Sequence, residues 1–427
     1  MGIGAGRTFH SDDAEPGPVL PGYGALSRRR LLAVAGLGAV AGLGAVGASR
    51  TVSGGSAAGQ DAGQPAAVPA AAGHKPRAAT RRLYLGTYTS SGDGKGVGLA
   101  RYDPQTGLVS AQGTLTGVAD PSFLALSPSG TALYTVNEQS QGSVTAVSVA
   151  ADGTLRVLGA QSTGGSGPCH LSVHSGGGHV LSANYDSGSI AVHPLAADGS
   201  LRPRTDLVQH TGSGPDPDRQ DGPHAHMVRS DPGGAFVLAV DLGTDTVYTY
   251  RLDTSTGKLT SVSQAAVTAG SGPRHLAFHP SGDYAYLANE LGDSVIVCGY
   301  DQATGAVSPG DPQPTVPDGS TSSGRNYPAE VLVSADGAFA YVSNRGNDSV
   351  ARFAVEDGGA TLRLLDVTPS GGAYPRHISF DPTGTLLFAA NQNSGSVTVF
   401  HVDRSTGVLT SAGSPFDAPT PVCVLPV

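Results

Sequence analysis

The stretch "GSGPRHLAFHPSGDYAYLANE", residues 270–290, holds the pattern from which the fold can be predicted. Two apolar runs flank a Ser-Gly turn, which is the pattern of a β-hairpin. Ionisable groups stand at the open end of this hairpin, because Arg274 and His275 begin the first run and Glu290 follows the second. The pattern therefore raises the question of why such groups gather where the two strands begin and end.

The same hairpin recurs along the chain, which indicates an internal repeat. The copies share a Gly nine residues after a Pro and an Asn seven residues after that, and they begin at Pro121, Pro168, Pro273, Pro328 and Pro375. A sixth copy carries a two-residue insertion, with Ala225 at the Pro position and Asp241 at the Asn position. A third, alternating strand follows each hairpin, and an acidic turn such as "DTSTGKL" precedes a fourth. Each unit of 46–57 residues thus holds four short strands, which is typical of a propeller blade.

The two ends of the repeated region complement each other. "RLYLGTYT" at 82–89 resembles the second strand of a unit without its first, and "PVCVLPV" at 421–427 resembles a first strand without its second. Paired, they would make a seventh blade and leave no sheet edge open. We therefore predict an all-β fold, a seven-bladed β-propeller over residues 81–427. Six blades with loose ends is the alternative.

Residues 1–80 lie outside the repeat. Within residues 1–48, "SRRRLL" at 27–32 and the Gly- and Ala-rich apolar run behind it resemble a twin-arginine export signal, and residues 49–80 have the composition of a disordered linker. We expect an exported chain, secreted or at the cell surface, with no stable membrane association once the signal is cleaved. An uncleaved membrane anchor is the alternative.

Composition narrows the class of partner. A net charge of −9 without a basic stripe argues against nucleic acid and leaves a small molecule. A closed ring needs no second chain, so we expect a monomer. The three cysteines, Cys169, Cys298 and Cys423, match no zinc spacing and are expected to be buried apolar residues.

Three positions of the repeat vary from blade to blade and are expected to meet at one mouth of the central channel. The residue after the Pro is, in chain order, Ser122, Cys169, His226, Arg274, Ala329, Arg376 and Val422. The next residue is Phe123, His170, Met227, His275, Glu330, His377 and Cys423. The residue after the Asn is Glu138, Tyr185, Leu242, Glu290, Arg345 and Gln392, with Tyr88 in the closing blade. Because only 14% of the chain is charged, this concentration of charge predicts a binding site.

These groups suit the opening of a lactone ring. Arginines hold anionic groups and would stabilise an oxyanion, while an imidazole or carboxylate would activate water. The same groups could close a lactone on a carboxylate substrate. Two plainer interpretations stay open: Arg274 and Glu290 could form a structural ion pair, and His224 with His226 could hold a metal, although the spacing supplies no third ligand. We expect no cofactor and no metal.

The motifs "PCHLSV", "DRQDGPHAH", "PRHLAFHP", "NE" and "SNRG" resemble those of the propeller lactonases, a family that includes a type of 6-phosphogluconolactonase and the fungal carboxymuconate cyclases. The resemblance covers nearly all of 81–427. It implies a seven-bladed propeller and catalysis without a required metal. It also implies a functional set that maps, by order and spacing, onto His226, Arg274, Glu290 and Arg345, with His224 competing for the place of His226. Around them, substrate-binding residues are expected at His170, His224, His275, Glu330, Arg376 and His377, with His170, Glu330, Arg376 and His377 in a second layer.

The predicted function is hydrolysis of a sugar-acid lactone, as in a 6-phosphogluconolactonase. The export signal is unexpected for an enzyme whose phosphorylated substrate is intracellular, so the lactone itself stays open. The segments "LYTVNE", "YVSNRG" and "FAANQ" also resemble YVTN-type repeats of non-enzymatic surface propellers. An exported binding module is therefore the alternative function, and a cyclase is another.

Overall fold

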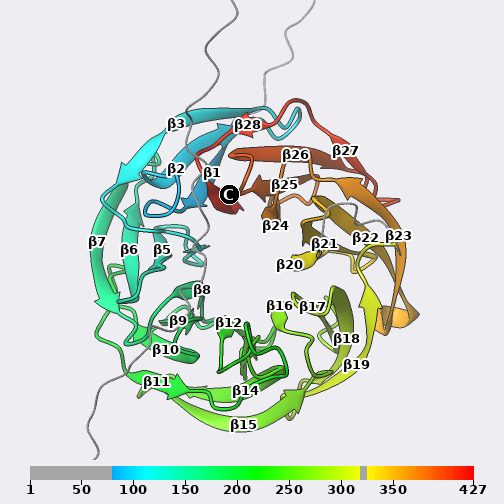
Figure 1. Ribbon diagram of the computed structural model, residues 1–427. Helices are drawn as coiled ribbons and strands as arrows, with labels where there is room; N and C mark the ends of the chain where they lie inside the picture. The colour runs from blue at the N-terminus through cyan, green and yellow to red at the C-terminus, as the bar shows by residue number, and fades with distance from the viewer. Residues whose placement is uncertain (1–78, 318–324) are drawn as a thin grey trace, which may run out of the picture. The chain divides into compact units, whose positions relative to one another are not determined.

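The computed structural model describes residues 79–317 and 325–427. Seven antiparallel sheets surround a central axis, and each presents one edge strand to that axis (Figure 1). The prediction of an all-β, seven-bladed propeller is confirmed. The predicted export signal and linker lie outside the described residues. Within the described ranges, no helix has the length and apolar character needed to cross a membrane.

The first three blades follow the repeat in chain order. Blade 1 consists of β4 (Leu124–Leu126), β5 (Ala132–Asn137), β6 (Ser143–Val149) and β7 (Leu155–Ser162). Blade 2 consists of β8 (Pro168–Val173), β9 (His179–Asn184), β10 (Ser189–Pro194) and β11 (Asp206–Gln209). Blade 3 consists of β12 (Ala225–Ser230), β13 (Val237–Asp241), β14 (Thr246–Asp253) and β15 (Lys258–Ala266).

The next three blades repeat this order from the axis outward. Blade 4 consists of β16 (Pro273–Phe278), β17 (Tyr284–Asn289), β18 (Ser294–Asp301) and β19 (Ala306–Pro314). Blade 5 consists of β20 (Tyr327–Val333), β21 (Phe339–Arg345), β22 (Ser349–Glu356) and β23 (Thr361–Pro369), with the 3₁₀ turn η1 (Asp357–Gly359) before β23. Blade 6 consists of β24 (Pro375–Phe380), β25 (Leu386–Asn391), β26 (Ser396–Val402), β27 (Leu409–Ser411) and β28 (Phe416–Asp417).

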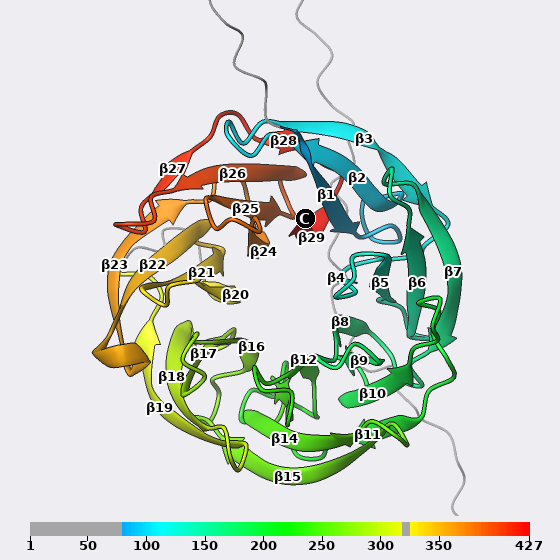
Figure 2. The same ribbon diagram turned by 180° about the vertical axis from the view of Figure 1, so that it is seen from behind.

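The two ends of the repeated region close the ring in blade 7. Its innermost strand is β29 (Pro421–Pro426), followed by β1 (Arg81–Thr87), β2 (Gly96–Tyr102) and β3 (Val109–Thr116). β29 pairs antiparallel with β1, with Val424 opposite Leu85. Figure 2 shows these two strands side by side at the inner end of that blade. The predicted closure is confirmed, and it leaves no unpaired strand at the junction of the termini.

The repeated Asn joins the second strand of a blade to the third. In blades 2 and 4, Nδ2 of Asn184 and of Asn289 donates to the hydroxyl of the Ser that begins the next strand, at 3.0 Å in each case. Both asparagines are fully buried. A buried amide needs hydrogen-bond partners. The Asn and the Ser of the "GSV"-type turn supply them to each other and so stabilise the turn between the second and third strands.

The acidic turns that precede the fourth strands connect neighbouring blades, because the carbonyl oxygen of a Gly in the turn accepts a hydrogen bond from the preceding blade. The Tyr341 hydroxyl of blade 5 donates to the carbonyl oxygen of Gly407 in blade 6, at 2.7 Å. Tyr286 makes the same contact with Gly359 of the following blade, at 3.0 Å. Gly407 has φ +73°, and a Cβ there would lie 2.6 Å from the ring of Phe339. A side chain at this turn would therefore prevent the close approach of the two blades.

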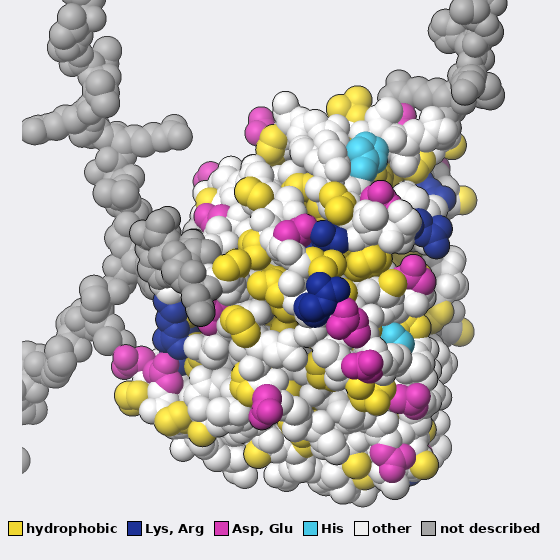
Figure 3. Space-filling model, turned by 90° about the vertical axis from the view of Figure 1, so that its right-hand side faces the viewer, with side chains coloured by type: hydrophobic (Ala, Val, Ile, Leu, Met, Phe, Trp, Pro, Cys, Tyr) yellow, Lys and Arg dark blue, Asp and Glu magenta, His cyan; other side chains and the backbone are white. Residues whose placement is uncertain are grey.

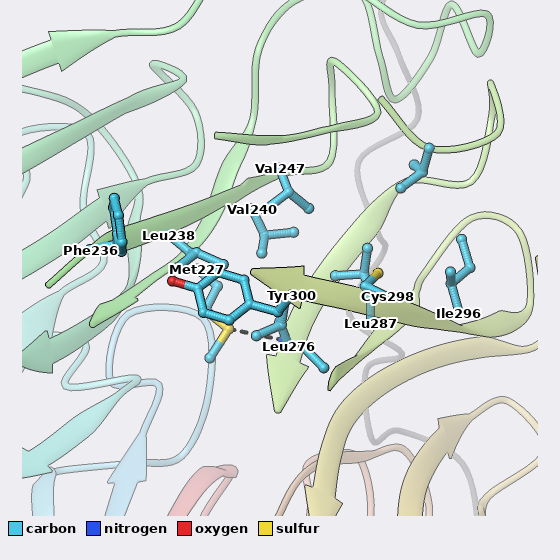
Figure 4. Close-up of a cluster of buried hydrophobic side chains, with 12 residues drawn as sticks. Met227, Phe236, Leu238, Val240, Val247, Leu276, Leu287, Ile296, Cys298 and Tyr300 are labelled. Atoms are coloured by element: carbon cyan, nitrogen blue, oxygen red, sulfur yellow. Dashed lines mark hydrogen bonds between the residues drawn. The ribbon is translucent and has the colours of Figure 1, made fainter. Parts of the chain in front are cut away.

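The core consists of clusters between adjacent sheets. One cluster joins blades 3 and 4 and contains Met227, Phe236 and Leu276, all buried (Figure 4). The Met227 sulfur accepts a hydrogen bond from the backbone N–H of Leu276, the dashed contact in the figure. Cys298 lies in the same cluster, and all three cysteines are buried and free. The prediction that the cysteines are buried is confirmed.

The side of the ring shown in Figure 3 carries scattered charges. Lys and Arg side chains alternate there with Asp and Glu, and no continuous basic stripe is visible on this face. Positive and negative charges mixed in this way do not create the positive electrostatic potential that would attract a polyanion to that face. The ionisable groups that gather in the molecule lie at the starts of the innermost strands and at the ends of the second strands.

Candidate active site

The candidate residues that follow the Pro are the extra residues of β-bulges. In blade 4 the register shifts between Pro273 and His275, so that Arg274 has no partner in β17. A one-residue shift also occurs at the start of the innermost strands of blades 2, 3, 5, 6 and 7, and in blades 2, 3 and 6 the extra residues are Cys169, His226 and Arg376, ionisable like Arg274. A bulge re-aims its side chain out of the regular alternation of the strand. We call these four residues the bulge residues.

Glu290 gathers three arginines. Its Oε2 lies 2.6 Å from Nη2 of Arg345 and 3.2 Å from Nε of Arg274. Its Oε1 lies 2.6 Å from Nη2 of Arg219. Burial alone would raise the pKa of Glu290, but the three guanidinium groups outweigh burial and hold this pKa well below the usual range. The carboxylate is therefore ionised at neutral and mildly acidic pH.

Arg274 keeps donors that this carboxylate does not use. Its Nε is within ion-pair distance of Glu290 but is not aligned for a hydrogen bond. Its Nη1 donates to the carbonyl oxygen of Ala329 at 2.7 Å, and its Nη2 has no acceptor among the described residues and is not fully buried. Burial, together with Arg345 and Arg376 nearby, lowers the pKa of Arg274 to about 10. The group is still protonated at neutral pH, so Nη2 is a charged donor open to a ligand.

Arg219 is a member of this cluster that the repeat did not predict. It lies in the loop between β11 and β12, and its Nη2 also donates to the Tyr185 hydroxyl, at 3.2 Å. About a third of its side chain is exposed, 34%. This loop is longer than the connections from β7 to β8 and from β15 to β16, so a comparison of blade positions could not find Arg219. The one available signal was the motif "DRQDGPHAH", which contains it.

His226 is the histidine of "PHAH" that joins the bulge residues. It is buried, with Nδ1 3.7 Å from Sγ of Cys169 and its ring edge-on to that of His275, 5.1 Å between centroids. Burial and, after it, the charge of Arg274 lower the pKa of His226 well below its usual value. The ring is therefore neutral at neutral pH and can accept a proton.

His224 occupies a different place. Its ring stacks on Tyr185 at 4.5 Å, and its Nδ1 lies 2.9 Å from the Tyr185 carbonyl oxygen. Its Nε2 lies 3.6 Å from Oδ1 of the exposed Asp221. His224 thus lies in the loop against Tyr185, whereas His226 contacts Cys169 and His275.

Arg376 was expected in the second layer. It is instead a bulge residue and occupies the same position in its blade as Arg274 does in blade 4. Its guanidinium lies over the Tyr88 ring at 5.6 Å, and it donates no hydrogen bond to any described residue. Glu138 lies nearby and accepts hydrogen bonds from the Tyr88 hydroxyl at 2.9 Å and from Ser122 Oγ at 2.5 Å. Burial raises the pKa of Arg376's neighbour Glu138, although Arg376 acts against it. The arginine is thus a cation without a hydrogen-bonded acceptor.

The residues at the second position form a plug below the bulge residues, which we call the axial layer. Nδ1 of His275 and Nε2 of His377 lie 2.8 and 3.5 Å from Oε2 of Glu330. Phe123 packs against the rings of His170, His275 and His377, with centroids 4.3, 5.9 and 5.4 Å away. On its other side this layer lines a cavity of about 470 Å³, which is bordered by turns of blades 1 to 3. His170, His275 and Glu330 are buried in this layer, and the ring of His275 contacts that of His226 among the bulge residues.

The structure offers no ready metal centre in residues 79–317 and 325–427. No group of three or more His, Cys, Asp or Glu side chains is arranged there to hold an ion. His224 and His226 turn their Nδ1 atoms to different partners, the Tyr185 carbonyl oxygen and the Cys169 sulfur. The described geometry thus supplies no shared ligand set for this pair.

The described residues thus form a closed seven-bladed propeller in which arginines, a carboxylate and a neutral imidazole gather near the innermost strands. The family described as "Lactonase, 7-bladed beta-propeller" matches residues 82–426, and the chain belongs to this family. The 6-phosphogluconolactonase of Bacillus subtilis (strain 168) is 36% identical over 343 residues, which cover 80% of this chain and 97% of that protein. The resemblance inferred from the motifs is confirmed.

Solved structures agree with this membership. A protein from Lactobacillus plantarum superposes with a TM-score of 0.77 at 34% identity, covering 82% of this chain and 100% of that one. The periplasmic gluconolactonase PpgL of Pseudomonas aeruginosa superposes with a TM-score of 0.74 at 29% identity, covering 82% of this chain and 99% of that one. Both likenesses span the whole propeller rather than a single blade.

Proposed function

We propose that the protein is a lactonase that hydrolyses a small lactone carrying an acidic group, at the mouth of the propeller channel. One observation carries the proposal: a buried Glu290 holds three guanidinium groups beside the neutral His226. The names of the relatives, 6-phosphogluconolactonase and gluconolactonase, support a sugar-acid lactone as the substrate class. A lone structural ion pair would not require three arginines on one carboxylate, with one donor of Arg274 left open.

The proposed reaction begins with attack of water on the lactone carbonyl. His226 accepts a proton from the water as the new C–O bond forms, and the carbonyl oxygen becomes an oxyanion. Arg274 and Arg345 stabilise that oxyanion. The bond between the carbonyl carbon and the ring oxygen then breaks, and His226 returns its proton to the ring oxygen. The product is a hydroxy acid, which loses its carboxyl proton to solvent.

Glu290 is assigned a positioning role rather than that of the base. Its pKa is held well below the usual range, and both oxygens already contact guanidinium groups. A general base works best when its pKa lies near the operating pH. The ring of His226 is neutral and its Nε2 has no partner among the described residues, so of the two bases predicted from the sequence we choose His226.

Arg376 is proposed to bind the acidic group of the substrate. It carries a permanent charge and donates to no described residue, so a phosphate or carboxylate can take up its planar donors without breaking an existing bond. His224 and Tyr185 would border the substrate from the loop. The axial layer, with His170, His275, Glu330 and His377, would form the floor.

The test is acid release from phosphorylated and unphosphorylated sugar lactones, corrected for spontaneous hydrolysis. We expect turnover of at least one lactone and a fall in kcat/KM of about 10²–10³-fold for Arg274→Ala and for His226→Gln. Arg363→Ala is the matched control, since that arginine is exposed and pairs with Glu356 on an outer strand. Wild-type activity in both site variants would overturn the proposed roles.

The absence of lactone hydrolysis would favour the alternative of a non-enzymatic binding propeller. A cyclase would be recognised by the opposite result, the consumption of a hydroxy acid or unsaturated diacid with formation of a lactone. Equilibrium measurements from both sides of the reaction separate these outcomes.

The proposal includes export through the segment at residues 27–32. Its support is the sequence itself and the periplasmic relative PpgL. Replacing Arg28 and Arg29 with Lys should retain the protein inside the cell, as followed by fractionation. Unchanged export would contradict a twin-arginine route, while a membrane-bound, uncleaved product would favour the anchor.

A further inference from the structure

We infer that the buried thiol of Cys169 is a positioning residue that fixes the tautomer of His226, with the proton on Nδ1 and the lone pair on Nε2. This inference rests on the proposed function only in treating His226 as the base. Cys169 and His226 are the bulge residues of neighbouring blades, so a β-bulge sets the direction of each side chain. Their contact is Sγ to Nδ1, at 3.7 Å.

The hydrogen-bonding capacities of the atoms around the sulfur decide which nitrogen carries the proton. Sγ of Cys169 lies 3.4 Å from the His226 carbonyl oxygen and 3.9 Å from that of Ala225. Carbonyl oxygens only accept hydrogen bonds, so the single thiol hydrogen is directed to them. The sulfur then serves the ring as an acceptor, and Nδ1 must be the donor. Burial raises the pKa of the Cys169 thiol, so it keeps this hydrogen at neutral pH.

The charges around His226 favour the same tautomer. Nδ1 faces the thiol, so Nε2 lies at the other edge of the ring. Nε2 has no partner among the described residues and is not one of the fully buried unpartnered atoms. Arg274, Arg345 and Arg376 all act on this ring. Near several guanidinium groups, an exposed lone pair is more stable than an exposed N–H.

The consequence for catalysis is that Nε2 is ready to accept a proton. In serine hydrolases a carboxylate imposes the working tautomer on the catalytic histidine, and the wrong tautomer abolishes most of the rate. A thiol is a weaker partner, but it carries no charge and therefore leaves the ring neutral among the arginines. We expect Cys169 to set the tautomer without raising the basicity of the ring.

The first test reads the tautomer directly. Protein labelled with ¹⁵N-histidine is examined by correlation of ring nitrogens with ring protons, and the His226 signals are assigned by their loss in His226→Gln. We expect Nδ1–H in the wild type, a shift towards Nε2–H in Cys169→Ala, and retention of Nδ1–H in Cys169→Ser. An Nε2–H ring in the wild type, or no change in Cys169→Ala, would overturn the inference.

The second test measures activity and uses a matched core cysteine. We expect kcat of Cys169→Ala to fall about tenfold with KM unchanged, and Cys169→Ser to recover most of it. Cys298→Ala makes the same change in a buried core and should alter neither kcat nor the His226 signals. If no lactone is turned over, the proposed function fails, but the spectra still show which nitrogen of His226 carries the proton. If His226→Gln is inactive and Cys169→Ala equals wild type, the inference fails alone.

Discussion

Glu290 and Glu138 occupy the same place in the repeat, directly after the Asn of their blades, yet their surroundings differ. Glu290 is buried among three guanidinium groups, and its pKa is held well below the usual range. Glu138 is partly exposed and accepts hydrogen bonds from two neutral hydroxyl groups, and its pKa is raised by burial. One backbone position therefore provides a permanent anion on one side of the axis and a carboxyl group that is easier to protonate on the other.

The difference shows that the scaffold and the chemistry of this propeller are set by different residues. The Pro, Gly and Asn of each repeat determine where a side chain is placed. The side chains around that position then decide its charge state. For Glu290 they are Arg274 from the same hairpin, Arg345 from blade 5 and Arg219 from the loop between β11 and β12. Substitutions at the site can therefore change the charge of a group while the scaffold that places it stays intact.

Glu290→Gln is expected to have the largest effect. It leaves three buried or partly buried guanidinium groups without their shared anion, and breaking a buried ion pair costs about 3–5 kcal/mol. We expect a fall in kcat/KM of about 10²-fold or more and a clear loss of thermal stability. Urea unfolding and lactone hydrolysis on the same preparation would measure both.

The pH dependence of this loss has a definite sign. The folded pKa of Glu290 lies below its ordinary value of 4.5, so its contribution to stability is fully present above about pH 4.5 and is lost as the pH falls further. The difference in unfolding free energy between wild type and Glu290→Gln should therefore be largest at neutral pH and shrink in acid. A difference that is independent of pH would show that Glu290 is not ionised in the folded state.

Arg376→Ala should affect binding more than chemistry. The guanidinium donates to no described residue, so its removal breaks no hydrogen bond of the fold. A charge-assisted contact to a ligand is worth about 2 kcal/mol, or about 30-fold in KM. We expect that increase for lactones with a phosphate or carboxylate and little change for neutral lactones, with kcat nearly unchanged. An equal effect on neutral lactones would contradict the assignment of Arg376 to the acidic group.

Arg219→Ala is expected to have a smaller effect than either. A third of its side chain is exposed, and ion pairs screened by solvent are worth at most about 1 kcal/mol. We expect a fall in kcat/KM of about fivefold or less, since Arg274 and Arg345 still hold Glu290. A loss as large as that of Glu290→Gln would show that the loop, rather than the bulge residues, organises the site.

The fold could be predicted almost completely because the repeat is regular. The spacing of Pro, Gly and Asn predicted which strands pair, and the structure places Pro273 opposite Asn289, with the substituted pair Ala225 and Asp241 aligned in the same way. The separated terminal strands predicted the closing blade. These features depend on local spacing, which a single sequence displays.

The site was predicted as a set of residues but not as a geometry. Position in the repeat identified Arg274, Glu290 and Arg345, whereas Arg219 lies in a loop outside the repeated positions and was missed. The sequence also could not show that the residue after the Pro is a bulge residue, so Arg376 was expected one layer too deep. Contacts between blades, such as Cys169 with His226, depend on the packing of the ring and are visible only in three dimensions.

Glu138→Gln should have the smallest effect and tests the other side of the comparison. Because the pKa of Glu138 is raised, its ionised form is disfavoured in the folded state, and the penalty grows as the pH rises above 4.5. Gln can still accept the hydrogen bond of one hydroxyl through its single amide oxygen, and the other hydroxyl can rotate to accept a hydrogen bond from the amide NH₂. We therefore expect stability within about 1 kcal/mol of wild type, equal in acid and slightly higher at pH 8.

Removal of a negative neighbour should leave kcat unchanged and keep or lower KM for an anionic lactone, since Arg376 loses a competitor. A large loss of activity would mean that Glu138, and not His226, transfers the proton.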